Sequence, residues 1–381
     1  MLYAHPLPIP ISNSYGTIES CTRGSILSET LKNERAFIGD AAVTTLNGFD
    51  FTDTWVAVDY KTPVLKSFAN EVDKRIDVSW YTKAEGTVED PYVLKDANDL
   101  YGFSMISKTD NFADKYVKLG ADIVVNEGTP SASWTSSNYR QWEPIGMTGV
   151  DGSKYATLNE FAGTFDGDMH TISGLYYVTD VRYGGLFAGT ATTATVKNLK
   201  LKNSYFKSTF GGNTLSYGFF GSVVGSAKGR FDTIYADITM DAGTSAVGGI
   251  IGGFRASGCK VNDCWFAGTV TNINAGRQIH GGIAGYAYGA SATIANCLNT
   301  GTISTNATGA NWIGGIIGGP ESSTITIENC LNVGLIQQTA NHTANFGPIY
   351  GHYAGTAPTL KNCYATTESC TKATGATTAS E

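Results

Sequence analysis

Charged side chains are scarce in this 381-residue chain: they make up 15% of it, and the formal net charge is −7. No cluster of lysine and arginine is visible, so the chain lacks the basic face that binds nucleic-acid phosphates. No stretch approaches the roughly 20 apolar residues of a membrane helix. We therefore expect neither a nucleic-acid partner nor a membrane span.

Helical spacing of apolar residues is almost as scarce. One stretch, near residues 96–107, places Leu100, Phe103 and Ile106 behind a candidate N-cap, Asp96. The opening run, MLYAHPLPIPISNSYG, also lacks the basic and long apolar segments of a secretory signal. We expect one short helix, and an export signal that has been removed or replaced.

Cysteine is present but forms no recognisable framework. The seven residues are an odd number, which is a poor basis for a disulfide set. Only Cys259 and Cys264 have the close spacing of half a zinc site, and no second pair completes it. We expect no metal and no cofactor.

Glycine is abundant instead, with 46 residues, and much of it marks an internal repeat. The segments GGIIGG, GGIAGY, GGIIGG and GPIYGH begin 33 residues apart, and two looser copies precede them with spacings of 37 and 27. A second marker, an Asn-Cys or Asp-Cys pair, keeps the same 33-residue interval. The segments begin at Gly184, Gly221, Gly248, Gly281, Gly314 and Gly347, and the second marker contains Cys264, Cys297, Cys330 and Cys363.

Each unit reads as three short strands separated by turns, for example GGIIGG, TITIENCL and VGLIQQ. No unit holds a stretch of about 10 residues with helical spacing, which disfavours a horseshoe of strands and helices, and a propeller blade needs four strands in about 40 residues. Three strands in 33 residues fit one turn of a β-helix. We expect an all-β, parallel and right-handed β-helix whose turns stack about 4.8 Å apart.

Stacking places equivalent residues of successive turns in columns. We expect an apolar column in the core, a cysteine column, and a column of turn residues whose side-chain amides hydrogen-bond along the axis. The thiols either bind a metal or form disulfides, or they fill a tight corner as small hydrophobes; we favour the corner, because no histidine or carboxylate recurs beside them. The columns are Ile250, Ile283, Ile316 and Ile349; Cys264, Cys297, Cys330 and Cys363; and Asn296, Asn329 and Asn362, preceded by Asp263.

The segments before the repeat carry a family resemblance. GTVEDPYVLKDANDLYGFS, KYVKLGADI, WEPIG and FAGTFDGDMHTISGL, with the units that follow, resemble the GLUG-motif proteins of bacterial surfaces, over roughly residues 85–364. The last of these segments is the most specific. The resemblance implies an exported, cell-surface β-helix in which the motif is a structural and adhesive module without catalytic residues. The absent signal peptide and the unusual first segment depart from that pattern.

We divide the chain into three parts: residues 1–84, a helical cap with the first coils at 85–180, and the coils at 181–381. The segment SYGTIESCTRGSI, with Cys21 in the ladder position, resembles a last coil, and an aromatic strand pair typical of an array's end follows it. Either residues 1–84 of one subunit cover the last coil of the next and build a head-to-tail filament, or the chain is a slice of a longer array. We keep both interpretations.

Candidate chemistry is confined to GTFDGDMHTISG. Asp166, Asp168 and His170 either ligate a metal or transfer protons, or they build a tight turn; we favour the turn, because the motif is part of the resembled family's fold signature. From Gly184 onward only 19 of 198 residues are charged. We therefore expect no enzymatic activity, and we keep a polysaccharide-active β-helix enzyme as the alternative.

A binding role fits the sequence better. Aromatic residues make up 11% of the chain, and Trp265 and Trp312 are candidates for stacking on sugars, although packing at coil corners is the competing interpretation. We expect an extracellular structural or adhesive protein that contacts copies of itself or cell-surface glycans and proteins.

Overall fold

The computed structural model describes residues 16–17, 31–32, 40–58, 61–71, 76–135, 139–152, 154–210, 218–243, 246–273, 278–305, 312–338, 345–366 and 369. The chain divides into two compact units, residues 1–83 and 84–381. The division falls one residue before the expected end of the N-terminal segment. The parts expected at 85–180 and 181–381 lie together in the second unit.

The N-terminal unit contains short elements. Its described strands form a parallel pair and an antiparallel hairpin, and the hairpin falls within the segment expected to hold an aromatic strand pair. Cys21, the expected ladder residue of this segment, lies outside the described residues. The elements are β1 (Gly16–Thr17), β2 (Leu31–Lys32), α1 (Asp40–Thr45), β3 (Trp55–Val58), β4 (Lys61–Leu65), η3 (Lys66–Glu71) and α2 (Ser79–Lys83).

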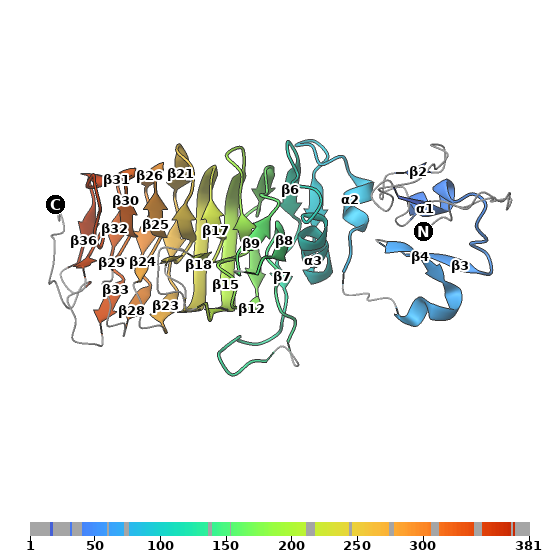
Figure 1. Ribbon diagram of the computed structural model, residues 1–381, viewed down its shortest axis with the longest axis horizontal. Coiled ribbons are helices and arrows are strands. Elements are labelled where there is room, and N and C mark those ends of the chain that lie inside the picture. The colour runs from blue at the N-terminus through green and yellow to red at the C-terminus, as the bar shows by residue number, and fades with distance from the viewer. Residues whose placement is uncertain are drawn as a thin grey trace. The chain divides into compact units, whose positions relative to one another are not determined.

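The second unit is a parallel β-helix, as the repeat predicts. Its turns follow one another from α3 to β36 in Figure 1, and each strand pairs in parallel with the equivalent strand of the next turn. The first wall consists of β13 (Tyr183–Gly184), β16 (Phe219–Gly221), β19 (Ala246–Gly248), β24 (Ile279–Gly281), β29 (Trp312–Gly314) and β34 (Asn345–Gly347). The second wall consists of β14 (Phe187–Gly189), β17 (Val224–Ala227), β20 (Ile251–Phe254), β25 (Ala284–Tyr288) and β30 (Ile317–Glu321).

The third wall, called the broad wall below, is a 19-stranded sheet. Two successive turns each cross this wall as a single long strand, residues 195–208 and 230–242, whereas the turns before and after them cross it as short strands. Its strands are β5 (Tyr92–Leu94), β6 (Tyr116–Leu119), β7 (Ile123–Val124), β10 (Thr164–Asp166), β11 (Thr171–Ser173), β12 (Tyr176–Thr179), β15 (Thr195–Ser208), β18 (Arg230–Ala242), β21 (Cys259–Asn262), β22 (Trp265–Phe266), β23 (Thr269–Asn272), β26 (Ser291–Ala295), β27 (Leu298–Asn299), β28 (Thr302–Thr305), β31 (Thr324–Glu328), β32 (Leu331–Asn332), β33 (Leu335–Gln338), β35 (Thr359–Lys361) and β36 (Tyr364–Ala365).

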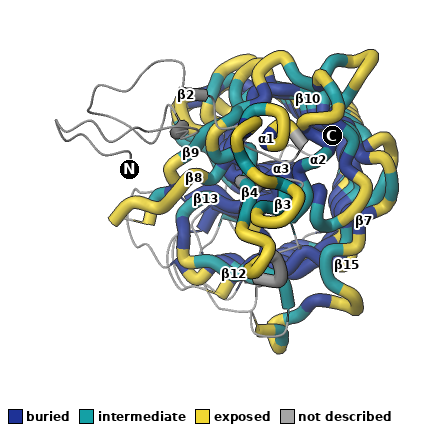
Figure 2. Tube along the Cα trace, turned by 90° about the vertical axis from the view of Figure 1, so that its right-hand side faces the viewer, coloured by how far each residue is buried: buried dark blue, intermediate teal, exposed yellow. Residues whose placement is uncertain are grey.

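The register reproduces the 33-residue period in the later turns. Val261 lies opposite Ile294, which lies opposite Ile327. Phe231 lies opposite Val261 one turn earlier, so the preceding turn is shorter. Within the second unit, the view along the coil in Figure 2 shows buried residues mainly toward the interior and exposed residues mainly toward the rim.

The glycine-rich marker differs from the prediction in one respect. The segment GGIIGG was expected to form one strand, but Gly314 ends β29 and Ile317 begins β30, so the segment turns a corner between the first two walls. A Cβ atom on Gly315 would lie 2.1 Å from the Pro348 carbonyl oxygen, so only glycine fits beside the next turn. The corner explains the Gly-Gly-Ile-Ile order.

The predicted helix is present as α3 (Ala97–Ile106), and it covers the first turn. The Asp96 carboxylate accepts hydrogen bonds from the backbone N–H groups of Asn98 and Asp99, which makes it the N-cap. Phe103 is fully buried, and its ring packs edge-on against Phe112, 4.9 Å away. The helix thereby closes the apolar end of the stack.

One further hairpin flanks the first turns. It consists of β8 (Met147–Val150) and β9 (Ala156–Leu158), which pair with each other in antiparallel fashion.

Candidate functional site

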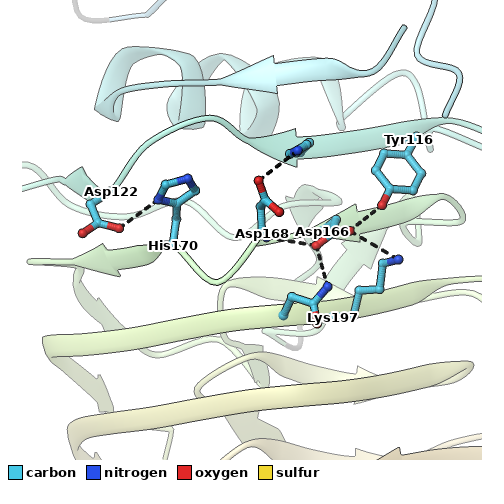
Figure 3. A network of polar contacts seen from close by, with 8 residues as sticks. Tyr116, Asp122, Asp166, Asp168, His170 and Lys197 are labelled. Carbon is cyan, nitrogen blue, oxygen red and sulfur yellow. Dashed lines mark hydrogen bonds and ion pairs between the residues drawn. The ribbon is translucent and has the colours of Figure 1, made fainter. Parts of the chain in front are cut away.

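The Asp166 region lies on the broad wall, where three successive turns meet. Tyr116 comes from β6, Asp166 from β10 and Lys197 from β15, and the register sets Asp166 opposite both Lys118 and Lys197. Figure 3 shows the Tyr116 hydroxyl and the Lys197 amine pointing toward the Asp166 carboxylate. Chemistry-bearing residues distant in sequence are therefore brought together by stacking.

Asp166 is 7% exposed, and its carboxylate has several polar partners. The Tyr116 hydroxyl donates to it, Asn198 Nδ2 donates at 2.9 Å, and Lys197 Nζ lies 3.3 Å away. The backbone N–H of Asp168 donates to it as well, at 2.9 Å. Burial alone raises the pKa of Asp166, but these contacts outweigh burial, so the pKa lies below its usual value.

The pKa values of two partners of Asp166, Tyr116 and Lys197, are raised above their ordinary values. Burial, followed by the hydrogen bond to Asp166, raises the pKa of the Tyr116 phenol. Burial lowers the pKa of Lys197, but the contacts with Tyr116 and Asp166 outweigh it and raise the pKa overall. At neutral pH the cluster holds an ionised carboxylate, a protonated amine and a neutral phenol.

The other two candidates of the motif have different partners. Asp168 pairs with Lys118, whose Nζ lies 2.9 Å from its carboxylate. His170 Nδ1 lies 3.1 Å from the Asp122 carboxylate, which also accepts the Thr171 backbone N–H. The side chains of Asp166, Asp168 and His170 therefore do not converge on one point where they could share a ligand.

A tight turn links these candidates. Asp168 has a φ of 48° and Met169 a φ of 64°, both in the left-handed region that is typical of turn residues. The turn joins β10 to β11, and the ion pair with Lys118 and the contact between His170 and Asp122 tie it to the preceding coil.

The Asp122 and His170 pair is the arrangement with the clearest catalytic chemistry. A carboxylate that holds one imidazole nitrogen leaves the other nitrogen free to accept or donate a proton. In the described part of the chain, no serine hydroxyl or cysteine thiol contacts His170. The same residues contain no group of three His, Cys, Asp or Glu side chains that could hold a metal ion.

Sequence reasoning missed five partners in this site, namely Tyr116, Lys118, Asp122, Lys197 and Asn198. Tyr116 lies opposite Thr164, at a spacing unlike the 33-residue period of the later turns. The early turns differ in length from one another, so the 33-residue period does not predict their register. The alternation in KYVKLGADI is the one signal that places Tyr116 and Lys118 on the same side of their strand.

The four ladder cysteines lie inside the coil. Each is at most 2% exposed, and all are free thiols, as is the buried Cys259. The hydrogen bond with Cys297, together with burial, raises the pKa of Cys330 to about 12. Protonated thiols of this kind are poor nucleophiles. Cys370 lies outside the described residues.

The expected asparagine column is present on the outer surface. Asn362 Nδ2 donates to Asn329 Oδ1 at 3.2 Å, and Asn329 Nδ2 donates to Asn296 Oδ1 at 3.1 Å. Each of these residues has a positive φ, as has Asp263. The column therefore marks the bend between the first two strands that each later turn contributes to the broad wall.

The isoleucine column lies in the core. Its members are fully buried or nearly so, and the backbone N–H of Ile283 donates to the Ile316 carbonyl at 3.0 Å. The column is Ile250, Ile283, Ile316 and Ile349.

The two candidate tryptophans have different environments. Trp312 is 5% exposed and packs in a core cluster with Phe219 and Tyr286, so it offers no surface to a ligand. Its selection as a binding residue was wrong, because its side chain is buried within this cluster. Trp265 is 42% exposed on the broad wall.

Trp265 belongs to a column of outward-facing apolar side chains, which we call the contact column. Trp265, Leu331 and Tyr364 are 40% to 57% exposed, and the other two members are half-buried. Successive members pair in register through the broad wall. The contact column consists of Tyr235, Trp265, Leu298, Leu331 and Tyr364.

Comparison with known proteins gives one curated relative and one solved structure. A scan against family models finds no match, so the resemblance to GLUG-motif proteins stays a prediction. The chain is 32% identical over 176 residues, 45% of its length, to halomucin from Haloquadratum walsbyi, and it spans 2% of that protein's length. Among the described residues, no helix is both long and apolar enough to cross a membrane.

The similar solved structure is a protein from Bacteroides ovatus provisionally named an immunoglobulin A1 protease. It is 22% identical, the match covers 74% of this chain and 77% of that one, and the TM-score is 0.56. The likeness shows that the two share the β-helix fold. Because the neighbour is named as an enzyme, the expectation that a chain of this kind has no enzymatic activity was wrong.

Proposed function

We propose that this protein is an extracellular β-helix of the cell surface that adheres to a neutral glycan through the contact column. The observation that carries the proposal is the exposed row of Trp265, Leu331 and Tyr364 on the broad wall. The likeness to halomucin supports a place at the cell surface. Exposed apolar rows of this kind are typical of interaction sites.

The composition of the middle turns of the contact column, around Trp265 and Leu298, favours a neutral partner. Between Cys264 and Glu321 the sequence has a single charged residue, Arg277. Beside the contact column runs the asparagine column, which presents side-chain amides every turn. Amide groups that can donate and accept, beside apolar platforms, match the hydroxyl edges and apolar faces of sugar rings.

Trp265 is held in a fixed orientation. Its Nε1 donates to Thr300 Oγ1 at 2.8 Å, and its ring packs edge-on against Tyr235 at 4.9 Å. A side chain that is fixed before binding loses little conformational entropy when a ligand covers it.

Substitution of the column tests this proposal. Trp265→Ser together with Tyr364→Ser should abolish retention of the protein on insoluble neutral polysaccharides in a pull-down assay. Tyr288→Ser is the matched control, because Tyr288 is 48% exposed but lies on the second wall. Equal retention of the column variant and the control, or no retention of the wild type on any glycan, would refute the proposal.

Self-assembly is the remaining proposal for a partner. The separate compact unit at residues 1–83 is compatible with an element that docks on another subunit. If residues 1–84 cover the last coil of a neighbour, deletion of residues 1–70 should leave only monomers in light scattering and electron microscopy. Filaments that persist after the deletion would exclude this arrangement.

Hydrolysis is a second candidate function, favoured by the Asp122 and His170 pair. We would incubate the protein with protein and polysaccharide substrates and compare Asp122→Asn with Asp180→Asn, an exposed carboxylate paired with Lys154. Turnover that is lost only in Asp122→Asn would support the candidate. Turnover that is absent in the wild type, or equal in both variants, would exclude hydrolysis by this pair.

A further inference from the structure

A pocket of about 340 Å³ lies beside the capping helix, apart from both the Asp166 cluster and the contact column. Lys108 follows α3, Trp142 and Glu143 lie on the segment before β8, and Tyr177 comes from β12. The volume is within the usual range for small-molecule sites. We propose that this pocket binds a single neutral sugar unit through the Tyr177 hydroxyl and the paired Lys108 and Glu143 side chains.

The floor of the pocket contains a polar group without a normal partner. Tyr177 is 2% exposed, and its hydroxyl makes no hydrogen bond of normal geometry to any residue that the structure describes, although the Thr179 side chain lies close by. A buried hydroxyl without a partner is unfavourable, because it has lost its hydrogen bonds to water. A ligand hydroxyl in the pocket would restore one of them.

One side of the pocket is formed by the Trp142 indole, whose N–H group already has a hydrogen-bond acceptor. Trp142 is 1% exposed, and its Nε1 donates to the Gly185 carbonyl at 3.2 Å. The indole therefore contributes only apolar surface. Met147 adds apolar surface from the β8 and β9 hairpin. These surfaces suit the C–H face of a sugar ring.

The rim selects against net charge. Lys108 Nζ and a Glu143 carboxylate oxygen are 2.7 Å apart, and both side chains are partly exposed. A sugar hydroxyl can accept from the amine and donate to the carboxylate at once, so the ion pair stays intact. A charged or zwitterionic ligand would have to separate the pair, which costs part of the binding energy.

The rim is also anchored to rigid structure. Ser104 Oγ, on α3, donates to the Glu143 carbonyl at 2.7 Å, and the buried Ser107 Oγ accepts the Gly146 N–H at 2.7 Å. The helix and the segment before β8 are thereby fixed to each other, so the pocket exists before a ligand arrives.

Titration with free monosaccharides tests the proposal directly. Glucose, galactose, mannose and N-acetylglucosamine would be titrated onto the full chain by calorimetry and by saturation-transfer NMR, with glucuronate and free amino acids as charged probes. We expect at least one neutral sugar to bind, and Tyr177→Phe to weaken it about tenfold, the usual effect of one lost hydrogen bond. Tyr176→Phe is the matched control, because that hydroxyl is already bonded to the Trp134 carbonyl.

Thermal unfolding without ligand separates a binding role from a structural one. Tyr177→Phe should not lower Tm, because the lost hydroxyl has no normal partner. Glu143→Gln should fold normally and weaken sugar binding, since it leaves Lys108 unpaired. A large fall in Tm for Tyr177→Phe, equal sugar affinity in wild type and Tyr177→Phe, a preference for the charged probes, or no binding at all would overturn the proposal. Sugar binding that Tyr177→Phe weakens belongs to the pocket, because Tyr177 is not a member of the contact column.

Discussion

Asn299 donates a hydrogen bond from its side-chain nitrogen to Asn332 Oδ1, 2.7 Å away in the interior of the coil. Both side chains are fully buried and occupy equivalent positions of successive turns. The Asn332 nitrogen has no partner among the described residues, because the next turn places Ala365 opposite it. The internal column of amides therefore ends at Asn332, because the equivalent residue of the next turn, Ala365, has no amide side chain.

Ala365→Asn should extend that column and stabilise the protein. The new Oδ1 atom would accept the unpaired Asn332 N–H, a gain of about 1 kcal/mol for a buried group. Urea denaturation measures the change in the free energy of unfolding. Ala365→Leu is the control, since it adds similar volume without an acceptor. An equal gain in both variants would show that packing, not the hydrogen bond, is responsible.

His280 makes stability depend on pH. It is fully buried between Val247 and Ile313 of the adjacent turns, and its Nε2 lies 3.1 Å from Gln278 Oε1. Burial lowers its pKa to about 3. Below an unfolded-state pKa near 6.5 the unfolded chain takes up a proton that the folded one refuses, so stability falls as the pH falls from about 6.5 toward 3.

His280→Ile should remove this dependence, because isoleucine already occupies the equivalent position in the next turn. Between pH 7 and pH 5 we expect the wild type to lose about 2 kcal/mol more than the variant. Chemical denaturation at the two pH values gives the comparison. Parallel losses in both proteins would show that His280 is not the group responsible.

The fold was predictable because the later turns repeat strictly. Two markers in step, the Gly-rich segment and the Cys residues, fixed the 33-residue period, and stacking then dictated which residues share a column. The strand boundaries were less accessible. GGIIGG contains apolar residues in a short run, which reads equally well as a strand or as a corner.

The candidate site was predictable only in part. FDGDMH identified Asp166, Asp168 and His170, but their partners lie in turns of different length. Trp312 was misplaced for a related reason: a tryptophan at a strand end can point inward or outward, and only the pairing of Ile279 with Trp312 shows that it continues a buried column. The sequence around Trp312 does not indicate which way its side chain points.

Asn329 tests the external amide column. Asn329→Gly keeps the backbone conformation, whose φ is 53°, and removes the side-chain hydrogen bonds. Asn329→Ala removes the hydrogen bonds and also strains the backbone, which costs about 1 kcal/mol more. The alanine variant should therefore have the lower Tm. The same Tm for both would mean that the positive φ carries no cost at this turn.

The ladder thiols should resist alkylation while the protein is folded. Cys297 is 2% exposed, and burial raises its pKa well above its ordinary value. Iodoacetamide at pH 8, with peptide mass spectrometry, should leave Cys297 and Cys330 unmodified until denaturant is added. Leu331→Cys supplies an exposed control thiol on the same wall, which should react quickly. Rapid labelling of Cys297 in the folded protein would contradict its position inside the coil.

Asp166 gives the last prediction, which concerns acid stability. Its folded-state pKa lies below its unfolded value, so its contribution is complete above about pH 4 and is lost as the pH falls through the folded-state pKa. Asp166→Asn should therefore destabilise the protein by about 1.5 to 3 kcal/mol at pH 7, since it removes the charge from hydrogen bonds with Tyr116 and Asn198. Asp180→Asn removes a carboxylate from an exposed ion pair with Lys154, and it should cost far less. The gap between wild type and Asp166→Asn should then narrow as the pH falls below about 4 and through the folded-state pKa, because the wild-type carboxylate takes up its own proton there. A gap that stays constant down to pH 2 would mean that the amide disturbs packing between the coils, and that the charge on Asp166 does not hold the three turns together.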